Sequence, residues 1–359
     1  MRKILVLLLL MWCIVPVSAA QIPRDLTDAI PDSAREFLDD TDKGDSFTSL
    51  NDGLSGLWNR TCKLLIVTVQ DSLGGVILVL SAILLCSVAE DCFSAAGGGK
   101  LFNPVPLVGT LVILLAVGSN MKNLMGLGEE TIQELNVFSK ALLPTLSAAT
   151  AAGGGAVAAS VRQVTTVFFS DLLMSLIHSL LLPLVWVFVA LSATDAILPS
   201  GRLGGIARGL QKGITWLLSG SLVLFTSYLT LSGAFASSAD NLTLRMTRSA
   251  IGGAIPVVGS IISDAADTIL AGAGVLKQSV GVLGTLTILA ACILPFLKLG
   301  VQYLLLKLSA FFAATVAPEP LVKLVEALST AFGLVLGMTG TAAALLLISV
   351  ASSVMVVSV

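Results

Sequence analysis

The sequence predicts an all-α, polytopic helical membrane protein with about six transmembrane helices. Three observations lead to this fold class. Hydrophobic residues make up 55% of the 359 residues and charged residues only 12%, whereas soluble domains contain about 25% charged residues. The mean hydropathy is +0.97. Uncharged runs long enough to cross a bilayer recur along the chain.

The N-terminus predicts a secretory signal peptide over residues 1–20. Arg2 and Lys3 precede an apolar run over residues 4–17, and three small residues, 18–20, follow it. The run is shorter than the roughly 20 residues that a spanning helix needs, which favours cleavage of the signal. An uncleaved anchor is the alternative.

The next segment, 21–62, is predicted to be an exported acidic segment. Residues 21–60 contain nine acidic and four basic side chains, a charge of −5, and few large apolar residues. A segment of this length and polarity cannot build a core of its own. We interpret it as a solvated arm, with a partner-binding segment as the alternative.

The rest of the chain, 63–359, is predicted to be a polytopic membrane domain. Its long uncharged runs predict spans at about 73–89, 104–121, 165–193, 214–236, 280–306 and 330–357. The pattern is less regular between residues 128 and 163, and we expect this piece to lie on the membrane or to dip into it.

The spacing of prolines indicates a possible two-copy parallel repeat, about 144–236 and 256–357. Two pairs of prolines have the same 39-residue spacing, and we assign kinks or turns to all four and to the neighbouring glycine: Pro144, Pro183, Pro256, Pro295 and Gly259. Residue identity between the copies is low, so coincidence is the alternative. With a cleaved signal, six spans place the mature N-terminus outside the cytoplasm, in agreement with a weak positive-inside bias.

The sequence contains no pattern of a catalytic, cofactor or metal site. It has one histidine and neither a CxxC pair nor a P-loop, and the intramembrane aspartyl protease motif GxGD is absent. It also has no basic face that would neutralise a row of phosphates. We therefore predict a protein that is not an enzyme, holds no cofactor or metal, and binds no nucleic acid.

Charged residues inside or beside the spans are the candidate path or partner-interface residues, because a carboxylate in hydrocarbon costs a few kcal/mol. Asp171 and His178 are seven residues apart and share a helix face. Lys298 lies near the end of a span. The alternatives are bonding between neighbouring helices for Asp171 and His178, and snorkelling for Lys298.

Residues 254–277 are predicted to form an amphipathic helix with a narrow acidic face. Four polar residues, which we name the acidic stripe, lie in an arc of about 140°: Ser263, Asp264, Asp267 and Thr268. A membrane-surface helix displays Lys and Arg instead, so we expect the stripe to meet protein or water. We expect a re-entrant or interfacial helix, because a further span would break the repeat.

The block over residues 255–307, IPVVGSIISDAADTILAGAGVLKQSVGVLGTLTILAACILPFLKLGVQYLLLK, resembles the stage III sporulation protein AE family of endospore-forming bacteria. The signal peptide, the exported segment and the stretch LLPTLSAATAAGGG are similar to that family as well. The resemblance implies that certain residues of the block matter, without giving them a role: Pro256, Gly259, Asp264, Asp267, Gly281, Pro295 and Lys298.

The resemblance also implies a non-enzymatic, multi-pass component of the channel complex between mother cell and forespore. Its partners would be the other membrane proteins of that complex and the lipid bilayer, and its location the mother-cell membrane around the forespore. A secondary transporter or permease for a small solute is the alternative, because proline-broken spans in two copies are typical of transporters. The sequence does not identify a cargo.

Overall fold

A computed structural model describes residues 24–38, 50–95, 104–198, 203–254 and 259–355, and all regular elements in these ranges are helices. Some side chains within the helices, those of residues 247–270 among them, lie outside this description. The predicted signal peptide also lies outside it. The all-α fold class is confirmed.

Two short helices, α2 (Arg24–Asp28) and α3 (Asp32–Leu38), precede a bundle of long ones. The long helices are α4 (Leu50–Ala95), α5 (Val105–Ala152), α6 (Ala156–Leu176), α7 (Leu182–Ile197), α8 (Leu203–Ala254), α9 (Gly259–Ala313) and α10 (Glu319–Met355). A π-helical turn, η2 (Ile177–Leu181), joins α6 to α7, so these two form one interrupted rod.

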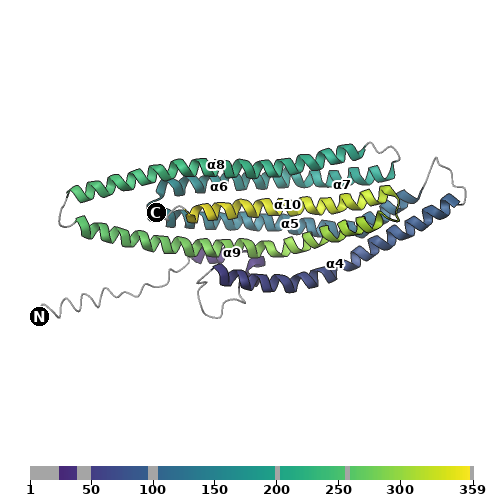
Figure 1. Ribbon diagram of the computed structural model, residues 1–359, viewed down its shortest axis with the longest axis horizontal. Coiled ribbons are helices and arrows are strands. Elements are labelled where there is room, and N and C mark those ends of the chain that lie inside the picture. Colours follow the sequence, from purple (N-terminus) through teal and green to yellow (C-terminus); the bar gives the residue numbers. More distant parts are fainter. Residues whose placement is uncertain (1–23, 39–49, 96–103, 199–202, 255–258, 356–359) are drawn as a thin grey trace.

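The long helices lie side by side in one elongated bundle (Figure 1). α5, α8 and α10 run in one direction, whereas α4, the α6–α7 rod and α9 run in the other. We name the end at which α5, α8 and α10 begin the near end, and the opposite end, at which α6 and α9 begin, the far end. The hairpin of α8 and α9 extends past the other helices at the far end (Figure 1).

Six helices in the described part of the chain are long and apolar enough to cross a membrane, as predicted. They are Arg60–Ala95, Val105–Ala152, Ala156–Ile197, Leu203–Asp240, Ala271–Ala313 and Glu319–Val354. Each is longer than the span predicted for it. α5 has 48 residues, which is roughly 72 Å at about 1.5 Å per residue, whereas the hydrocarbon core of a bilayer is about 30 Å thick. The bundle is therefore longer than a bilayer is thick.

α5 shows why the helices exceed the predicted spans. The predicted span ends at residue 121, but the helix continues through the less regular piece to Ala152. Buried residues at helical spacing, such as Ile132, Leu135 and Phe138, keep one face of this second half packed on the bundle. The chain then turns back at Gly154, whose φ of 87° is a left-handed conformation that glycine adopts without strain.

Two prolines lie inside unbroken helices, whereas a third follows a turn that is widened to a π-helix. Pro144 and Pro295 lie inside the uninterrupted helices α5 and α9. Pro183 has no N–H to donate and its ring crowds the carbonyl four residues earlier. The turn before it widens to the π-helix η2, where the Leu182 N–H donates to the Ile177 carbonyl. Pro256 lies outside the described residues, and the repeat stays a prediction.

Residues 259–277 of the predicted interfacial helix 254–277 lie on one helix with the predicted span 280–306. α9 runs from Gly259 to Ala313 without a break, as 55 residues. The side chains of the acidic stripe lie outside the described part of the structure. Its position relative to the membrane stays a prediction.

The core of the bundle is built from apolar side chains and hydroxyl groups. α9 packs along α10 and α5, and Phe138, Phe225 and Phe332 are completely buried. Several buried hydroxyls are bonded between or within helices, as in the Thr166–Ser349 contact of 2.6 Å that joins α6 to α10. This packing holds α5 and α6 in a fixed register, and their register determines the polar contacts described next.

Candidate functional site

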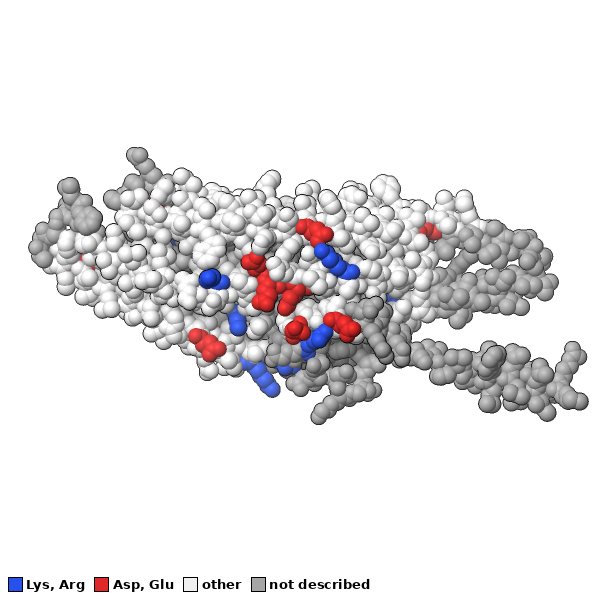
Figure 2. All heavy atoms as spheres, turned by 180° about the vertical axis from the view of Figure 1, so that it is seen from behind, with Lys and Arg blue, Asp and Glu red and all other residues white. Residues whose placement is uncertain are grey.

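Charged and polar side chains of α5, α6 and η2 form a partly exposed group near the middle of the bundle's length. We name Glu129, Asn136, Lys140, Asp171 and His178 the polar cluster. Large apolar side chains on the same two rods, such as those of Val137 and Leu172, are exposed beside it. In the view from behind, charged side chains gather over the middle of a face that is otherwise mostly uncharged (Figure 2).

Within the polar cluster, one ion pair and two hydrogen bonds join the helices. Lys140 Nζ lies 3.2 Å from Asp171 Oδ1, and Asn136 Nδ2 donates to the same oxygen at 3.3 Å. His178 Nδ1 lies 2.6 Å from Glu129 Oε1. Each contact joins α5 to the α6–α7 rod. The side chains of Lys140 and Asp171 are 54% and 50% exposed, so these pairs contribute at most about 1 kcal/mol each to folding.

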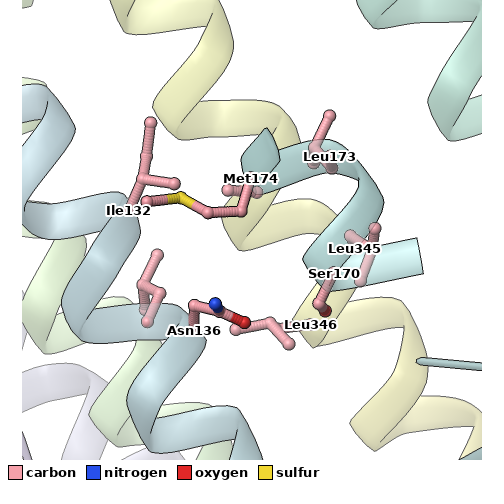
Figure 3. A pocket seen from close by; sticks show the side chains of 9 residues that line it. Ile132, Asn136, Ser170, Leu173, Met174, Leu345 and Leu346 are labelled. Atoms are coloured by element: carbon pink, nitrogen blue, oxygen red, sulfur yellow. The ribbon is translucent and has the colours of Figure 1, made fainter. Parts of the chain in front are cut away.

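A small cavity lies directly beside the polar cluster, between α5, α6 and α10. It has about 20 Å³ of space for the centre of a water-sized molecule, and its walls include Ile132, Met174 and Leu346 (Figure 3). Asn136 Oδ1 and Ser170 Oγ are buried without a hydrogen-bond partner. Figure 3 shows Asn136 reaching from α5 toward α6 and α10. The size and the two unpaired oxygens suit one bound water molecule.

The N-terminal helices contact the bundle close to the polar cluster. Ser33 Oγ of α3 donates to Glu134 Oε2 of α5 at 2.6 Å, and Glu134 lies between Glu129 and Asn136 along the same helix. Leu26 and Ala34 are completely buried against the bundle. Residues 24–38 of the predicted solvated arm are therefore docked on the bundle, and residues 50–62 of the same segment form the start of α4.

The structure brings together two of the residues predicted from the sequence and leaves the others apart. Asp171 and His178 both belong to the polar cluster, each with a partner on α5. Lys298 is half-buried on α9 and forms no hydrogen bond or ion pair with the described residues. The acidic stripe lies outside the described side chains, so its role stays a prediction.

Sequence reasoning missed the α5 half of the polar cluster. Glu129 and Lys140 lie within residues 128–163, which were not predicted to be a span. Their charges were therefore not considered as charges inside a span. A helical wheel extended past residue 121 would have placed them on one side of the helix, because eleven residues are close to three turns. Their partners on α6 could not have been chosen without the register between the two helices.

The polar cluster can bind and orient another molecule through its charged and polar groups, but its composition indicates no covalent chemistry. Its side chains pair with one another and leave no activated nucleophile. Within the described residues, no group of three or more His, Cys, Asp and Glu side chains could hold a metal ion. The half-exposed side chains of the polar cluster are accessible to protein or water.

An all-helical bundle with six helices that are long and apolar enough to span a bilayer defines a polytopic membrane protein. A sequence model of the stage III sporulation protein AE family matches residues 33–358, and the chain belongs to this family. The protein is therefore a membrane component of sporulation, as the resemblance implied.

A curated relative supports the same assignment. Stage III sporulation protein AE of Bacillus subtilis (strain 168) is 25% identical over 300 residues, which are 84% of this chain and 74% of that protein. No solved structure matches the chain.

Proposed function

We propose that this protein is a non-enzymatic, multi-pass component of a channel or transport complex between mother cell and forespore. It would reside in the mother-cell membrane around the forespore, with its mature N-terminus outside the cytoplasm. It acts there by binding other membrane proteins of the complex through polar surfaces on its helices. Family membership supports the role in sporulation, and the polar cluster supports the mode of action.

The position of the polar cluster is the observation that carries this proposal. Glu129 lies roughly 36 Å along α5 from Val105, at about 1.5 Å per residue, which exceeds the thickness of the hydrocarbon core of about 30 Å. If the apolar first half of α5 crosses the membrane, the polar cluster projects beyond it. The cluster then lies on the side of the exported N-terminal segment, whose Ser33 bonds to Glu134.

A contact surface also explains why the pairs are exposed. Half-exposed ion pairs contribute little to folding, but charged groups give specificity and orientation when a partner covers them. Exposed apolar neighbours such as Val137 and Leu172 would supply the hydrophobic part of the same interface. We include the acidic stripe of α9 in this proposal as a second contact surface.

The proposal predicts that the polar cluster is needed for assembly but not for folding. In sporulating cells, the double variant Glu129→Ala with Asp171→Ala should accumulate normally in membranes, and its free energy of unfolding should change by no more than about 1 kcal/mol. Recovery of partner membrane proteins with it should fall at least about tenfold, since a charge left unpaired in an interface is costly. The measurements are spore counts, affinity capture and thermal unfolding in detergent.

The matched control removes an exposed ion pair at the near end. Glu319→Ala breaks the contact of 2.7 Å between Lys323 Nζ and Glu319 Oε1 and should leave capture and spore counts unchanged. Normal capture of partners by the Glu129 and Asp171 double variant would contradict the proposed contact surface.

The proposed orientation has its own prediction. After replacement of the native cysteines, a cysteine at position 205 should react with a membrane-impermeant reagent only from the cytoplasm, and one at position 245 only from outside. Gly205 suits the experiment because no heavy atom lies within 4 Å of an added Cβ. The reverse labelling pattern would overturn the orientation while leaving the fold intact.

A further inference from the structure

Two basic side chains are buried inside the bundle toward its far end. Arg162 of α6 is 5% exposed and Lys277 of α9 is 2% exposed. Both lie on helices that are apolar enough to cross a membrane. Lysine and arginine are almost never buried this deeply unless they are paired.

Neither side chain has the partners that burial requires. Arg162 Nε and Nη1 and Lys277 Nζ are buried and donate no hydrogen bond to a described residue. The two groups are near enough to repel each other electrostatically. A buried cation without a counter-ion costs several kcal/mol, and Arg162 cannot escape this cost by losing its proton, because guanidinium stays charged in proteins.

Among the described side chains, one carboxylate lies near these cations, and it is already occupied. Asp240 of α8 is 7% exposed, and it attracts Arg162. Its two oxygens accept hydrogen bonds from the backbone N–H groups of Val157 (3.0 Å) and Ala158 (2.9 Å) at the start of α6. Counted over the described side chains, two positive charges are thus matched by a single negative charge that points at the backbone. This leaves a net charge of +1 and three N–H-bearing atoms without a hydrogen-bond acceptor.

Glycines leave room around the two cations. A Cβ on Gly233 of α8 would lie 3.2 Å from Arg162 Nη2, so the guanidinium lies directly against bare backbone. Gly274 lies one turn before Lys277 on α9, and no heavy atom lies within 4 Å of the place that its Cβ would take. A side chain at Gly233 would therefore crowd the Arg162 guanidinium.

We propose that Arg162 and Lys277 form a binding site for an oxyanion of the phosphate type, enclosed by α6, α8 and α9. Arginine presents a planar fork of donors that fits phosphate oxygens, and lysine adds a point charge. The anion would neutralise both cations and satisfy their free donors. It would also tie α9 to α6, two helices from different parts of the chain. The phosphate comes either from solution or from a lipid headgroup, and the test separates these sources.

The test measures binding on the purified full-length protein in non-ionic detergent and is therefore independent of the proposed role in sporulation. Sodium phosphate is titrated at constant ionic strength, with sodium chloride as the reference salt, and the unfolding temperature is recorded. For the wild type, the unfolding temperature should rise with phosphate concentration. Lys277→Met and Arg162→Met should each weaken the apparent affinity at least about tenfold, because each removes a charge-assisted contact.

Three variants separate binding from a purely structural role. Arg162→Lys keeps the charge and should retain most of the phosphate response. Lys212→Met removes an exposed lysine of α8 and should respond as the wild type does. Without phosphate, Lys277→Met should unfold at the same temperature as the wild type or higher, since it removes an uncompensated buried charge. A lysine needed only for packing would give a lower temperature instead.

The lipid source is tested in nanodiscs of phosphatidylcholine with or without phosphatidylglycerol. Stabilisation by phosphatidylglycerol that is lost in Lys277→Met assigns the site to a lipid headgroup. A phosphate response that is the same in both lipids assigns it to a soluble anion. Equal phosphate responses of wild type and Lys277→Met, or no response of the wild type to either phosphate or phosphatidylglycerol, would overturn the proposal.

Discussion

Replacement of Asp240 by alanine should lower the free energy of unfolding by about 3–5 kcal/mol, because it leaves two backbone N–H groups without an acceptor and removes a buried negative charge near Arg162. The carboxylate accepts two backbone N–H groups at the start of α6, and Ala158, which donates one of them, is completely buried. Gly155 precedes α6 and offers no side chain that could cap the helix in its place. Arg162 would at the same time lose the one negative charge that the described side chains place near it.

A double-mutant cycle separates the two roles of Asp240. Adding Arg162→Met to Asp240→Ala should recover at least about 1 kcal/mol, because the cation left unpaired is then gone. Asp240→Asn should lose less than the alanine variant, since one amide oxygen can still accept a backbone N–H. Thermal or denaturant unfolding in detergent, without phosphate, measures all of these variants.

The matched control for Asp240 is an exposed aspartate of α4. Asp91→Ala should change the free energy of unfolding by less than about 0.5 kcal/mol, as is usual for surface positions. A loss of similar size in Asp91→Ala and Asp240→Ala would show that the buried carboxylate has no special role in joining α8 to α6.

The number of membrane-crossing helices could be predicted from the sequence because hydropathy alone marks them. A long run without charges, such as residues 330–357, is stable in a bilayer as a helix, because only a helix satisfies all backbone hydrogen bonds within the segment. The full helix lengths could not be read in the same way. Residues 122–152 of α5 carry charges on one face and buried apolar side chains on the other, so a search for uncharged runs stops there although the helix does not.

Only one half of the polar cluster, Asp171 and His178, could be predicted from the sequence. Asp171 and His178 are conspicuous because each is charged or polar within an apolar run. Their partners Lys140 and Glu129 are 31 and 49 residues away in the sequence, and the pairing follows from how α5 and α6 pack after the turn at Gly154. A helical wheel describes one helix and contains no information on the register between two.

The burial of Arg162 and Lys277 could not be predicted from the sequence either. Arg162 and Lys277 each lie next to polar residues at the edge of an apolar run, which is typical of a basic residue in the headgroup region. Only the packing of α6, α8 and α9 shows that both side chains point inward. Asp240 is likewise one aspartate among several until its contacts with the start of α6 are seen.

Gly128 is a position where the bundle tolerates no side chain, and Gly128→Leu should lower the free energy of unfolding by about 3 kcal/mol or more. A Cβ there would lie 2.7 Å from Val335 Cγ1, 3.4 Å from Thr339 Oγ1 and 3.5 Å from Leu299 Cδ1. The nearest atom belongs to a valine, whose branched side chain cannot swing away. α5 therefore has to move away from both α9 and α10.

The same helix provides the matched control for Gly128. Gly126→Leu places the same side chain two residues earlier, on the exposed side of α5, where no heavy atom lies within 4 Å of an added Cβ. It should leave stability unchanged or raise it by up to about 1 kcal/mol, since leucine favours a helix more than glycine does. Unfolding in detergent compares the two variants. Equal stabilities would contradict the close packing of α5 on α9 and α10, since small residues at a helix interface matter only where backbones approach closely.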